Sequence, residues 1–129
     1  MNKAWEDTIR CGDVQIVLDL IERGADLNGL DRYGQTALML AAHTGHRELV
    51  EILIAHRADL NVTAKFGLSA LMLAIVAGHA DIARLLAEAE ADLSLRGTGA
   101  PGFAGRTAHD LALAHDLPGL ATALQPKTQ

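Results

Sequence analysis

The chain has 129 residues and a net charge of −5; half of its residues are apolar and only 3% are aromatic. This length predicts one domain, with a core built from aliphatic side chains and alanine. The negative charge argues against partners that need clustered Lys and Arg, namely nucleic-acid backbones and anionic membranes.

Cysteine usage and apolar runs bear on the compartment. The sequence contains a single cysteine, Cys11, and therefore no pair that could form an internal disulfide, which is typical of a reducing compartment. No uninterrupted apolar leader follows Met1, and no apolar run approaches the roughly 20 residues of a membrane span. We therefore expect a cytoplasmic protein, with export by a route that uses no cleavable signal left open.

The sequence repeats itself every 33 residues. The motif Ala-Asp-Leu-Asn at positions 25–28 returns at 58–61 and, with serine in the last place, at 91–94. The segment 36–41 returns in closely similar form at 69–74. A fixed interval of roughly 20 to 50 residues indicates a stack of small units, each of which buries its apolar face against its neighbours.

The first unit, residues 1–29, starts directly with a helix and is expected to cap the stack. Trp5 and Ile9, one helical turn apart, are expected in the core. Glu6 and Asp7 are polar where the next unit has apolar residues. A terminal unit needs such polar positions because one of its faces meets water.

The second unit, residues 30–62, is predicted to contain a turn and two helices. The hydroxyl of Thr36 can cap a short helix over residues 37–43, and Gly45 can end that helix in the left-handed conformation. A second helix with a broad apolar stripe is predicted over residues 47–56.

The third unit, residues 63–95, follows the same pattern, whereas the last unit, residues 96–129, departs from it. Five residues are inserted in a glycine-rich segment at 97–104, which we expect to form a long mobile finger. The last helix is predicted to start near Pro118, and the tail at 125–129 is predicted to fray. The last unit therefore reads as the second cap.

Each unit pairs a narrow helix with a bulky one. The first helix of the second unit carries Ala37, Ala41 and Ala42, whereas the second helix carries Leu, Ile and Val. Stacking narrow helices along one side should curve the array and place them on its concave side. We therefore predict an all-α solenoid of stacked helix–turn–helix units with short β-hairpin-like tips, forming one domain over residues 1–129.

These motifs resemble the ankyrin repeat. The family pattern combines a glycine turn, a Thr-Pro-Leu-His helix start, a Gly-His pair and an Ala-Asp-Val-Asn exit. Residues 31–34, 36–39, 45–46 and 58–61 match it, with alanine in place of proline and methionine in place of histidine. The resulting Thr-Ala-Leu-Met variant is similar to that of bacterial members of the family.

The resemblance implies a non-catalytic module that presents its concave surface and hairpin tips to a folded protein partner. It also implies a protein that is monomeric when free, needs no cofactor or metal, and binds neither nucleic acid nor membrane. The acidic balance of the chain favours a basic or apolar partner. Transferred position by position, the family's contact positions are Arg32, Tyr33, Gln35, His43, Thr44, His56, Lys65, Phe66, Leu68 and Val76.

Tyr33 and Phe66 occupy equivalent tip positions, and two readings of them stay open. Either both rings contact the partner, as aromatic side chains at interfaces often do, or each ring folds over its own hairpin to bury apolar area. Leu68, Val76 and Ala77 are expected to form an apolar patch with Phe66, of the kind that usually marks an interaction site.

A second class of function, a small-molecule or metal-binding protein or an enzyme, would use the C-terminal part of the chain. Residues 97–105 contain the spacing G-x-G-x-x-G, but a dinucleotide site needs this motif inside a βαβ unit, which neither flank predicts. His109, Asp110 and His115 are the candidate reactive or ligating groups. The alternative for these histidines is an ordinary structural role at the edge of the core.

Two further residue types recur with the repeat. His46 and His79 are expected to tie neighbouring turns together rather than to bind zinc, for which the sequence has neither a His-Glu-x-x-His motif nor a cysteine cluster. Asn28 and Asn61 resemble ankyrin asparagines that are hydroxylated in animal cells; the alternative is that each asparagine stabilises its own turn.

Overall fold

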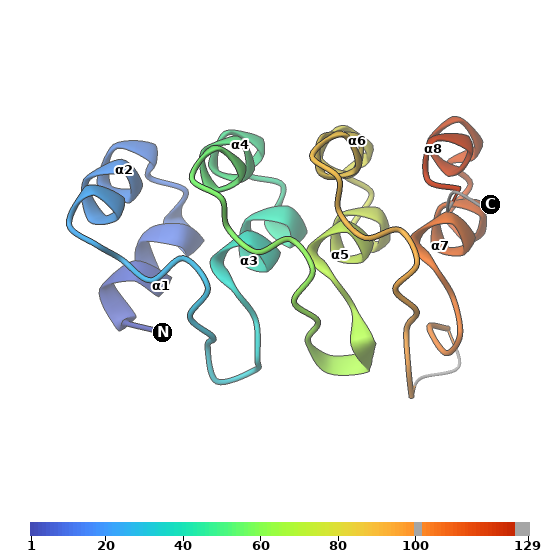
Figure 1. Cartoon of the computed structure of the whole chain (residues 1–129), viewed down its shortest axis with the longest axis horizontal. Coiled ribbons are helices and arrows are strands. Elements are labelled where there is room, and N and C mark those ends of the chain that lie inside the picture. Colours follow the sequence, from blue (N-terminus) through green and yellow to red (C-terminus); the bar gives the residue numbers. More distant parts are fainter. Residues whose placement is uncertain (100–101, 126–129) are drawn as a thin grey trace.

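The computed structural model describes residues 1–99 and 102–125 as a solenoid of helices in two layers (Figure 1). Eight α-helices of these residues alternate between the layers. The inner layer contains α1 (Lys3–Cys11), α3 (Ala37–Thr44), α5 (Ala70–Val76) and α7 (Ala108–Ala114). The outer layer contains α2 (Val14–Glu22), α4 (Arg47–Ala55), α6 (Ala80–Glu88) and α8 (Pro118–Ala123).

The predicted all-α repeat solenoid is confirmed. Over the described residues there is no strand, but only an isolated bridge between Gly97 and Ala104 and a short 3₁₀ turn, η1 (Lys65–Gly67). The loops between successive helix pairs all point to the same side of the stack (Figure 1). None of the described helices combines the length and the apolar character that crossing a bilayer requires.

Buried hydroxyl groups start three of the inner helices. The side chains of Thr36, Ser69 and Thr107 accept hydrogen bonds from the backbone N–H of the third helical residue, at 3.2, 3.3 and 3.3 Å. Such caps satisfy backbone donors that the helix itself leaves unpaired. At the other end of α3, Gly45 adopts a φ of 84°, so the predicted helix differs from the observed one by a single residue.

Alanine makes the inner layer narrow enough for close packing. Ala37, Ala41 and Ala74 are fully or almost fully buried, and the inner helices make most of the contacts between neighbouring helix pairs. The outer helices contribute larger side chains, such as Leu53 and Leu86, which are completely buried. All these residues belong to one continuous core, to which each buried leucine contributes about 1.5–3 kcal/mol.

A histidine and a glycine connect the first helix pair to the second and the second pair to the third. A Cβ atom on Gly45 would lie 2.8 Å from Cε1 of His79, and one on Gly12 would lie 2.7 Å from Cε1 of His46. Glycine is therefore required at these positions both for the left-handed backbone and for the approach of the ring. Neither ring caps the helix that it precedes, so both histidines act by packing against the previous repeat.

The asparagines form a second connection between repeats. Oδ1 of Asn28 accepts a hydrogen bond from the backbone N–H of Asp59, and Oδ1 of Asn61 accepts one from Asp92, both at 2.8 Å. Each side chain therefore bridges to the following repeat rather than stabilising only its own turn. The series ends at Ser94, whose hydroxyl donates to Oδ1 of Asp92 within the same turn, at 2.6 Å.

Both ends of the stack contain the expected core anchors. Trp5 is 3% exposed and Ile9 is completely buried. At the other end Leu120 and Leu124 are buried, and α8 begins at Pro118 as predicted. The predicted fraying concerns the tail at 125–129, of which residues 126–129 lie outside the described residues.

Candidate interaction surface

Three loop ends project side by side from the inner layer and form the candidate surface (Figure 1). We call them the first tip (residues 30–35), the second tip (residues 63–68) and the third tip (residues 96–99 and 102–106), and together the tip row. A backbone hydrogen bond closes the base of each tip. The donor and acceptor are Asp31 and Gln35 (2.9 Å), Ala64 and Leu68 (3.0 Å), and Gly97 and Arg106 (2.9 Å).

The first tip is organised by a buried carboxylate. Oδ1 of Asp31 accepts hydrogen bonds from the backbone N–H groups of Tyr33 and Gln35, at 2.8 and 2.9 Å. Oδ2 has no hydrogen-bond partner, but it faces the guanidinium of Arg10 at 3.6 Å. Arg10 also contacts Glu6 at 3.0 Å, so the two carboxylates neutralise this cation and fix the tip against α1.

Tyr33 is the exposed aromatic residue of the first tip. Its side chain is 62% exposed, and the guanidinium carbon of Arg32 lies 5.5 Å from the ring centroid. A ring that covered its own hairpin would be largely buried, so the structure contradicts that reading for Tyr33. The scaffold does not need this ring for its core, and the ring is accessible to a partner.

Phe66, at the equivalent position of the second tip, has a different environment. Its ring is half-buried and lies 5.7 Å from the ring of Phe103, measured between centroids. Its carbonyl oxygen accepts a hydrogen bond from the backbone N–H of Thr98 at 2.7 Å. Phe66 therefore buries apolar area, as the second reading proposed, but it does so against the third tip instead of its own hairpin.

The third tip is attached to the second tip, which differs from the mobile finger expected from its glycine content. Besides the contacts to Phe66, Nη1 of Arg96 donates to the carbonyl oxygen of Gly105 at 2.6 Å. The backbone N–H of Gly105 donates to the carbonyl oxygen of Gly97 at 2.9 Å. Positions 100 and 101, also assigned to the finger, lie outside the described residues.

Leu68 was assigned wrongly to the contact surface. It is only 6% exposed, because it immediately precedes the helix cap Ser69, a position at which an apolar side chain packs back onto the first turn of the helix. Val76 and Ala77 are half-buried, so the expected apolar patch around Phe66 loses its largest aliphatic member. Gln35, the equivalent of Leu68 in the first tip, is also half-buried.

The remaining predicted contact residues fall in two places. His43 and Thr44 are exposed at the end of α3 in the inner layer, where the hydroxyl of Thr44 donates to the carbonyl oxygen of Leu40 at 2.7 Å. Lys65 is exposed in the second tip. His56 follows α4 in the outer layer, and its Nδ1 lies 2.9 Å from the carbonyl oxygen of Ile52. The structure therefore separates His56 from the surface formed by the inner helices and tips.

The side chains proposed for an enzyme or a metal site have local structural roles. The carboxylate of Asp110 accepts a hydrogen bond from the backbone N–H of Thr107 at 3.0 Å, and this bond lowers the pKa of Asp110. Nδ1 of His109 lies 2.6 Å from the carbonyl oxygen of Ala121 and so joins α7 to α8. His115 is exposed. No group of three or more potential metal ligands occurs within residues 1–99 and 102–125.

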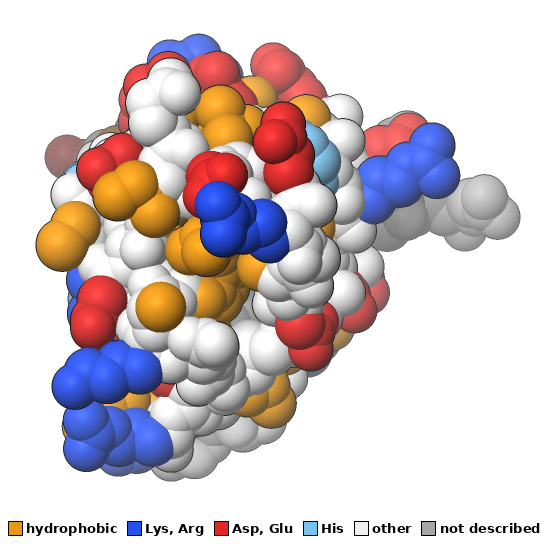
Figure 2. Space-filling model, turned by 90° about the vertical axis from the view of Figure 1, so that its left-hand side faces the viewer, with side chains coloured by type: hydrophobic (Ala, Val, Ile, Leu, Met, Phe, Trp, Pro, Cys, Tyr) orange, Lys and Arg blue, Asp and Glu red, His pale blue; other side chains and the backbone are white. Residues whose placement is uncertain are grey.

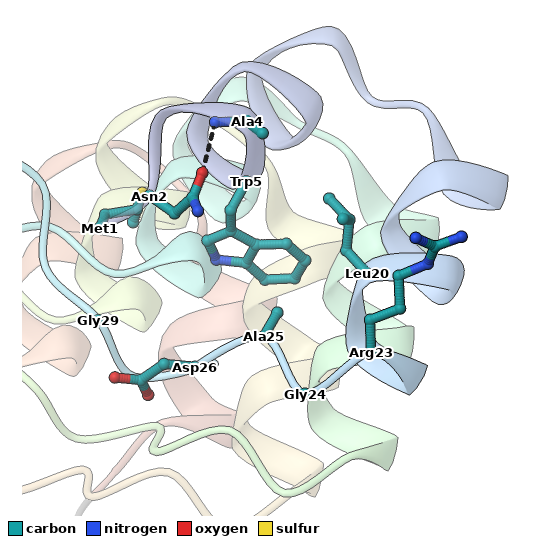
Figure 3. A pocket seen from close by; sticks show the side chains of 10 residues that line it. All are labelled: Met1, Asn2, Ala4, Trp5, Leu20, Arg23, Gly24, Ala25, Asp26 and Gly29. Atoms are coloured by element: carbon teal, nitrogen blue, oxygen red, sulfur yellow. Dashed lines mark hydrogen bonds between the residues drawn. The ribbon is translucent and has the colours of Figure 1, made fainter.

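A hollow at the N-terminal end, with a volume of about 450 Å³, lies between α1, α2 and the loop that follows α2 (Figure 3). Trp5, Leu20 and Ala25 form an apolar part of its wall, and Arg23 and Asp26 lie at its rim. Asp26 accepts a hydrogen bond from the backbone N–H of Asn28, and Arg23 pairs with Asp19. The hollow brings together no nucleophile and general base.

Sequence reasoning missed three residues of the tip row: Phe103, Arg96 and Arg106. All three belong to or flank the inserted segment, where the repeat supplies no equivalent position. A usable signal was present, because the chain has only two phenylalanines and one of them lies in the insertion. An aromatic residue in the inserted segment was a reason to expect a contact with Phe66, and therefore between the second and third tips.

Comparisons with known proteins agree with the repeat architecture. A family model described as ankyrin repeats, in three copies, matches residues 7–96. Two ankyrin repeat proteins of Rickettsia felis, RF_p14 and RF_pd14, are each 44% identical to the chain over 41 residues, or 32% of its length. The matched part spans 65% and 62% of these two proteins, respectively.

Proposed function

The chain belongs to the ankyrin repeat family, and from this premise we propose that it is a non-catalytic module that binds a partner protein through the tip row and the exposed ends of the inner helices. Members of the family are in general protein–protein interaction modules. The observation that carries the assignment to the tip row is the exposure of Tyr33, whose ring is 62% exposed although nothing in the core requires it.

The physical basis of binding is a rigid surface. The tips are closed by backbone hydrogen bonds, the first tip is fixed by Asp31, and the third tip is attached to the second tip through Phe66. Little conformational entropy is lost when such a surface docks, and this raises the affinity that a given set of contacts can provide. Tyrosine and arginine, which the first tip presents together, are frequent hot-spot residues in interfaces.

The test is capture of partners from a lysate of the source cells by the immobilised protein. We expect Arg32→Ala with Tyr33→Ala to reduce the captured partner at least about tenfold, because hot-spot side chains contribute about 2 kcal/mol or more each. The melting temperature should change little, since both side chains are exposed.

The matched control removes a cation and an exposed apolar side chain from the outer layer, with Arg84→Ala and Ile16→Ala, where Ile16 is 47% exposed. Capture should then equal that of the wild type. Capture that survives the change in the first tip but is lost in the control would place the binding surface on the outer helices.

A further inference from the structure

The tip row has a charge opposite to that of the whole chain. Its exposed charged side chains are all cations: Arg32, Lys65, Arg96 and Arg106. The tip residues include one carboxylate, Asp31, whose side chain is completely buried and faces Arg10. The net charge of −5 therefore comes from the helices and their connecting turns. The basic or apolar partner that we expected from this net charge does not match the positively charged tip row.

None of the tip cations forms an ion pair within the described residues, although Nη1 of Arg96 donates a hydrogen bond to the carbonyl oxygen of Gly105. Within the described part of the chain, every ion pair involves one of three other residues, Arg10, Arg23 or Arg47. Asp110 lies close enough to Arg96 for the two charges to interact, but its carboxylate caps α7. In Figure 2 the largest group of Lys and Arg side chains lies at the lower end of the molecule, where the tips are, and Asp and Glu side chains are spread over the helical part.

Aromatic rings hold two of these cations in defined positions. The guanidinium of Arg32 lies 5.5 Å from the Tyr33 ring centroid, and Nζ of Lys65 lies 5.0 Å from the Phe66 ring centroid. The same cation–aromatic pair therefore occurs at equivalent places in two repeats. The π electrons of each ring attract the cation and restrict its side chain before any ligand is present. These side chains therefore lose less conformational freedom when a carboxylate binds.

The repeat sets the spacing of Arg32 and Lys65, which occupy equivalent positions in two neighbouring units. Neighbouring inner helices pack directly against each other, and packed helices lie about 8–10 Å apart. An extended polyproline-II segment advances about 3.1 Å per residue with about three residues per turn, so every third side chain lies on the same side at intervals of about 9 Å. An acidic side chain at every third position of such a segment would meet one tip after another.

We propose that the tip row binds an extended acidic segment of the partner protein, with one carboxylate for each cationic tip. This inference rests on the proposed interaction function and specifies the chemistry of its ligand. A protein segment is favoured over a nucleic acid, because four separate cations on a chain of net charge −5 do not match the dense phosphate charge of a polynucleotide.

The test uses fluorescence anisotropy with a labelled synthetic peptide of about 12 residues, with glutamate at every third position and proline or serine elsewhere. The wild-type protein should bind it, and affinity should fall as NaCl rises from about 0.05 to about 0.5 M, because salt screens exposed charges. Arg32→Glu with Lys65→Glu should weaken binding at least about tenfold, since each reversal replaces an attraction by a repulsion.

The control Arg57→Glu with Arg84→Glu changes the net charge equally, on exposed residues outside the tip row, and should leave the affinity within about twofold. Thermal melts check folding, and the milder Arg32→Gln with Lys65→Gln replaces the reversals if these unfold the protein. An equal loss in tip and control variants would overturn the proposal, because it would show that only net charge matters.

Two further ligands decide between alternatives. A peptide of the same composition with its glutamates clustered should bind at least about threefold more weakly, because fewer of its carboxylates reach a tip. Equal affinity, or tighter binding of a single-stranded oligonucleotide with the same charge, contradicts the proposal. If capture depends on Arg32 and Tyr33 but no acidic peptide binds, the interaction function stands and the acidic specificity falls.

Discussion

At the scale of single residues, the backbone is left-handed at the second residue after the end of α2, α4 and α6. The equivalent residues Gly24, Arg57 and Glu90 have φ values of 92°, 63° and 70°. Only glycine adopts this conformation without a steric cost, which for other residues is about 1–2 kcal/mol. The first repeat therefore carries the favourable residue, whereas the second and third repeats are strained at this point.

We predict that Arg57→Gly and Glu90→Gly each raise the free energy of unfolding by about 0.5–1 kcal/mol, because the relief of strain exceeds the entropy that glycine adds to the unfolded chain. Urea denaturation monitored by circular dichroism measures the change. The matched control is Gly24→Ala, where an added Cβ would meet no atom within 4 Å but would face the same backbone strain. It should lose about 1 kcal/mol; a loss of stability in the two glycine variants would contradict this reading.

Phe66 presents the same strain in a bulkier side chain, with a φ of 63°. Its contact with Phe103 and the hydrogen bond from Thr98 hold it there. The alignment of Phe66 with Tyr33 could not indicate this difference, because the contact comes from the insertion, which interrupts the repeat. The two equivalent positions therefore differ in backbone conformation as well as in burial, because Phe66 has a positive φ and Tyr33 does not.

At the scale of elements, the N-terminal cap of α7 includes a carboxylate, that of Asp110, whose charge depends on pH. The side chain of Thr107 accepts from the backbone N–H of Asp110, and the carboxylate of Asp110 accepts from the backbone N–H of Thr107. This second bond favours the ionised form, which is why the pKa of Asp110 is lowered. A carboxyl with a lowered pKa stabilises the folded state above its unfolded pKa, and this contribution is lost as pH falls through the folded pKa.

We therefore predict that Asp110→Ala lowers the free energy of unfolding by about 1 kcal/mol at about pH 6. The difference between variant and wild type should shrink as the pH falls below the usual pKa of an aspartate and through the lowered pKa of the native carboxyl. Urea denaturation over a series of pH values measures this change. A difference that stays constant with pH would show that the charge of Asp110 does not contribute to the cap.

The asparagine bridge gives a second prediction for the elements. Asn61→Ala removes the acceptor for the backbone N–H of Asp92 in the next repeat and should cost about 1 kcal/mol. Ser94→Ala is the matched control, because Ser94 bonds only within its own turn and should cost about half as much or less. Equal losses in denaturation experiments would mean that the bond between repeats adds nothing beyond the local turn.

Much of the element level could be predicted from the sequence, because its signals are local. Thr36 and Gly45 indicate where α3 begins and ends, because one caps the backbone N–H groups and the other adopts a positive φ. The ends predicted from these two residues lie within one residue of the observed bounds. The same is true of the repeated alanines, whose small size already indicates a narrow inner layer. Leu68 was misassigned because burial depends on which neighbouring atoms cover a side chain, and these atoms lie outside its own turn.

At the scale of the whole molecule, charge is segregated in a way that composition conceals. Carboxylates and cations are paired on the outer helices, as Arg47 is with Glu51 and Asp81 at 3.0 and 3.5 Å. The glutamate and aspartate partners raise the pKa of Arg47 further above its usual value. The exposed charge of the tips is instead of one sign. A total of −5 contains no information about this arrangement, which depends on the fold bringing tips from three repeats together.

The continuous core makes the helix pairs depend on one another. Leu38 and Leu71 are each 1% exposed and lie in adjacent inner helices. Leu71→Ala should lower the free energy of unfolding by about 2–5 kcal/mol, because it leaves a cavity in the middle of the stack. Denaturation followed at Trp5 should report the loss, although Trp5 lies at the N-terminal end of the stack. An unchanged midpoint at Trp5 would show that the repeats unfold independently.

The central claim, that the tips form one binding surface, is tested most directly by following backbone amide signals of the isotope-labelled protein by NMR during titration with the acidic peptide. We predict that chemical-shift changes concentrate in residues 30–35, 63–68, 96–99 and 102–106 and grow together with a single affinity. Changes concentrated in α2, α4 and α6, or no saturable changes at all, would contradict the account.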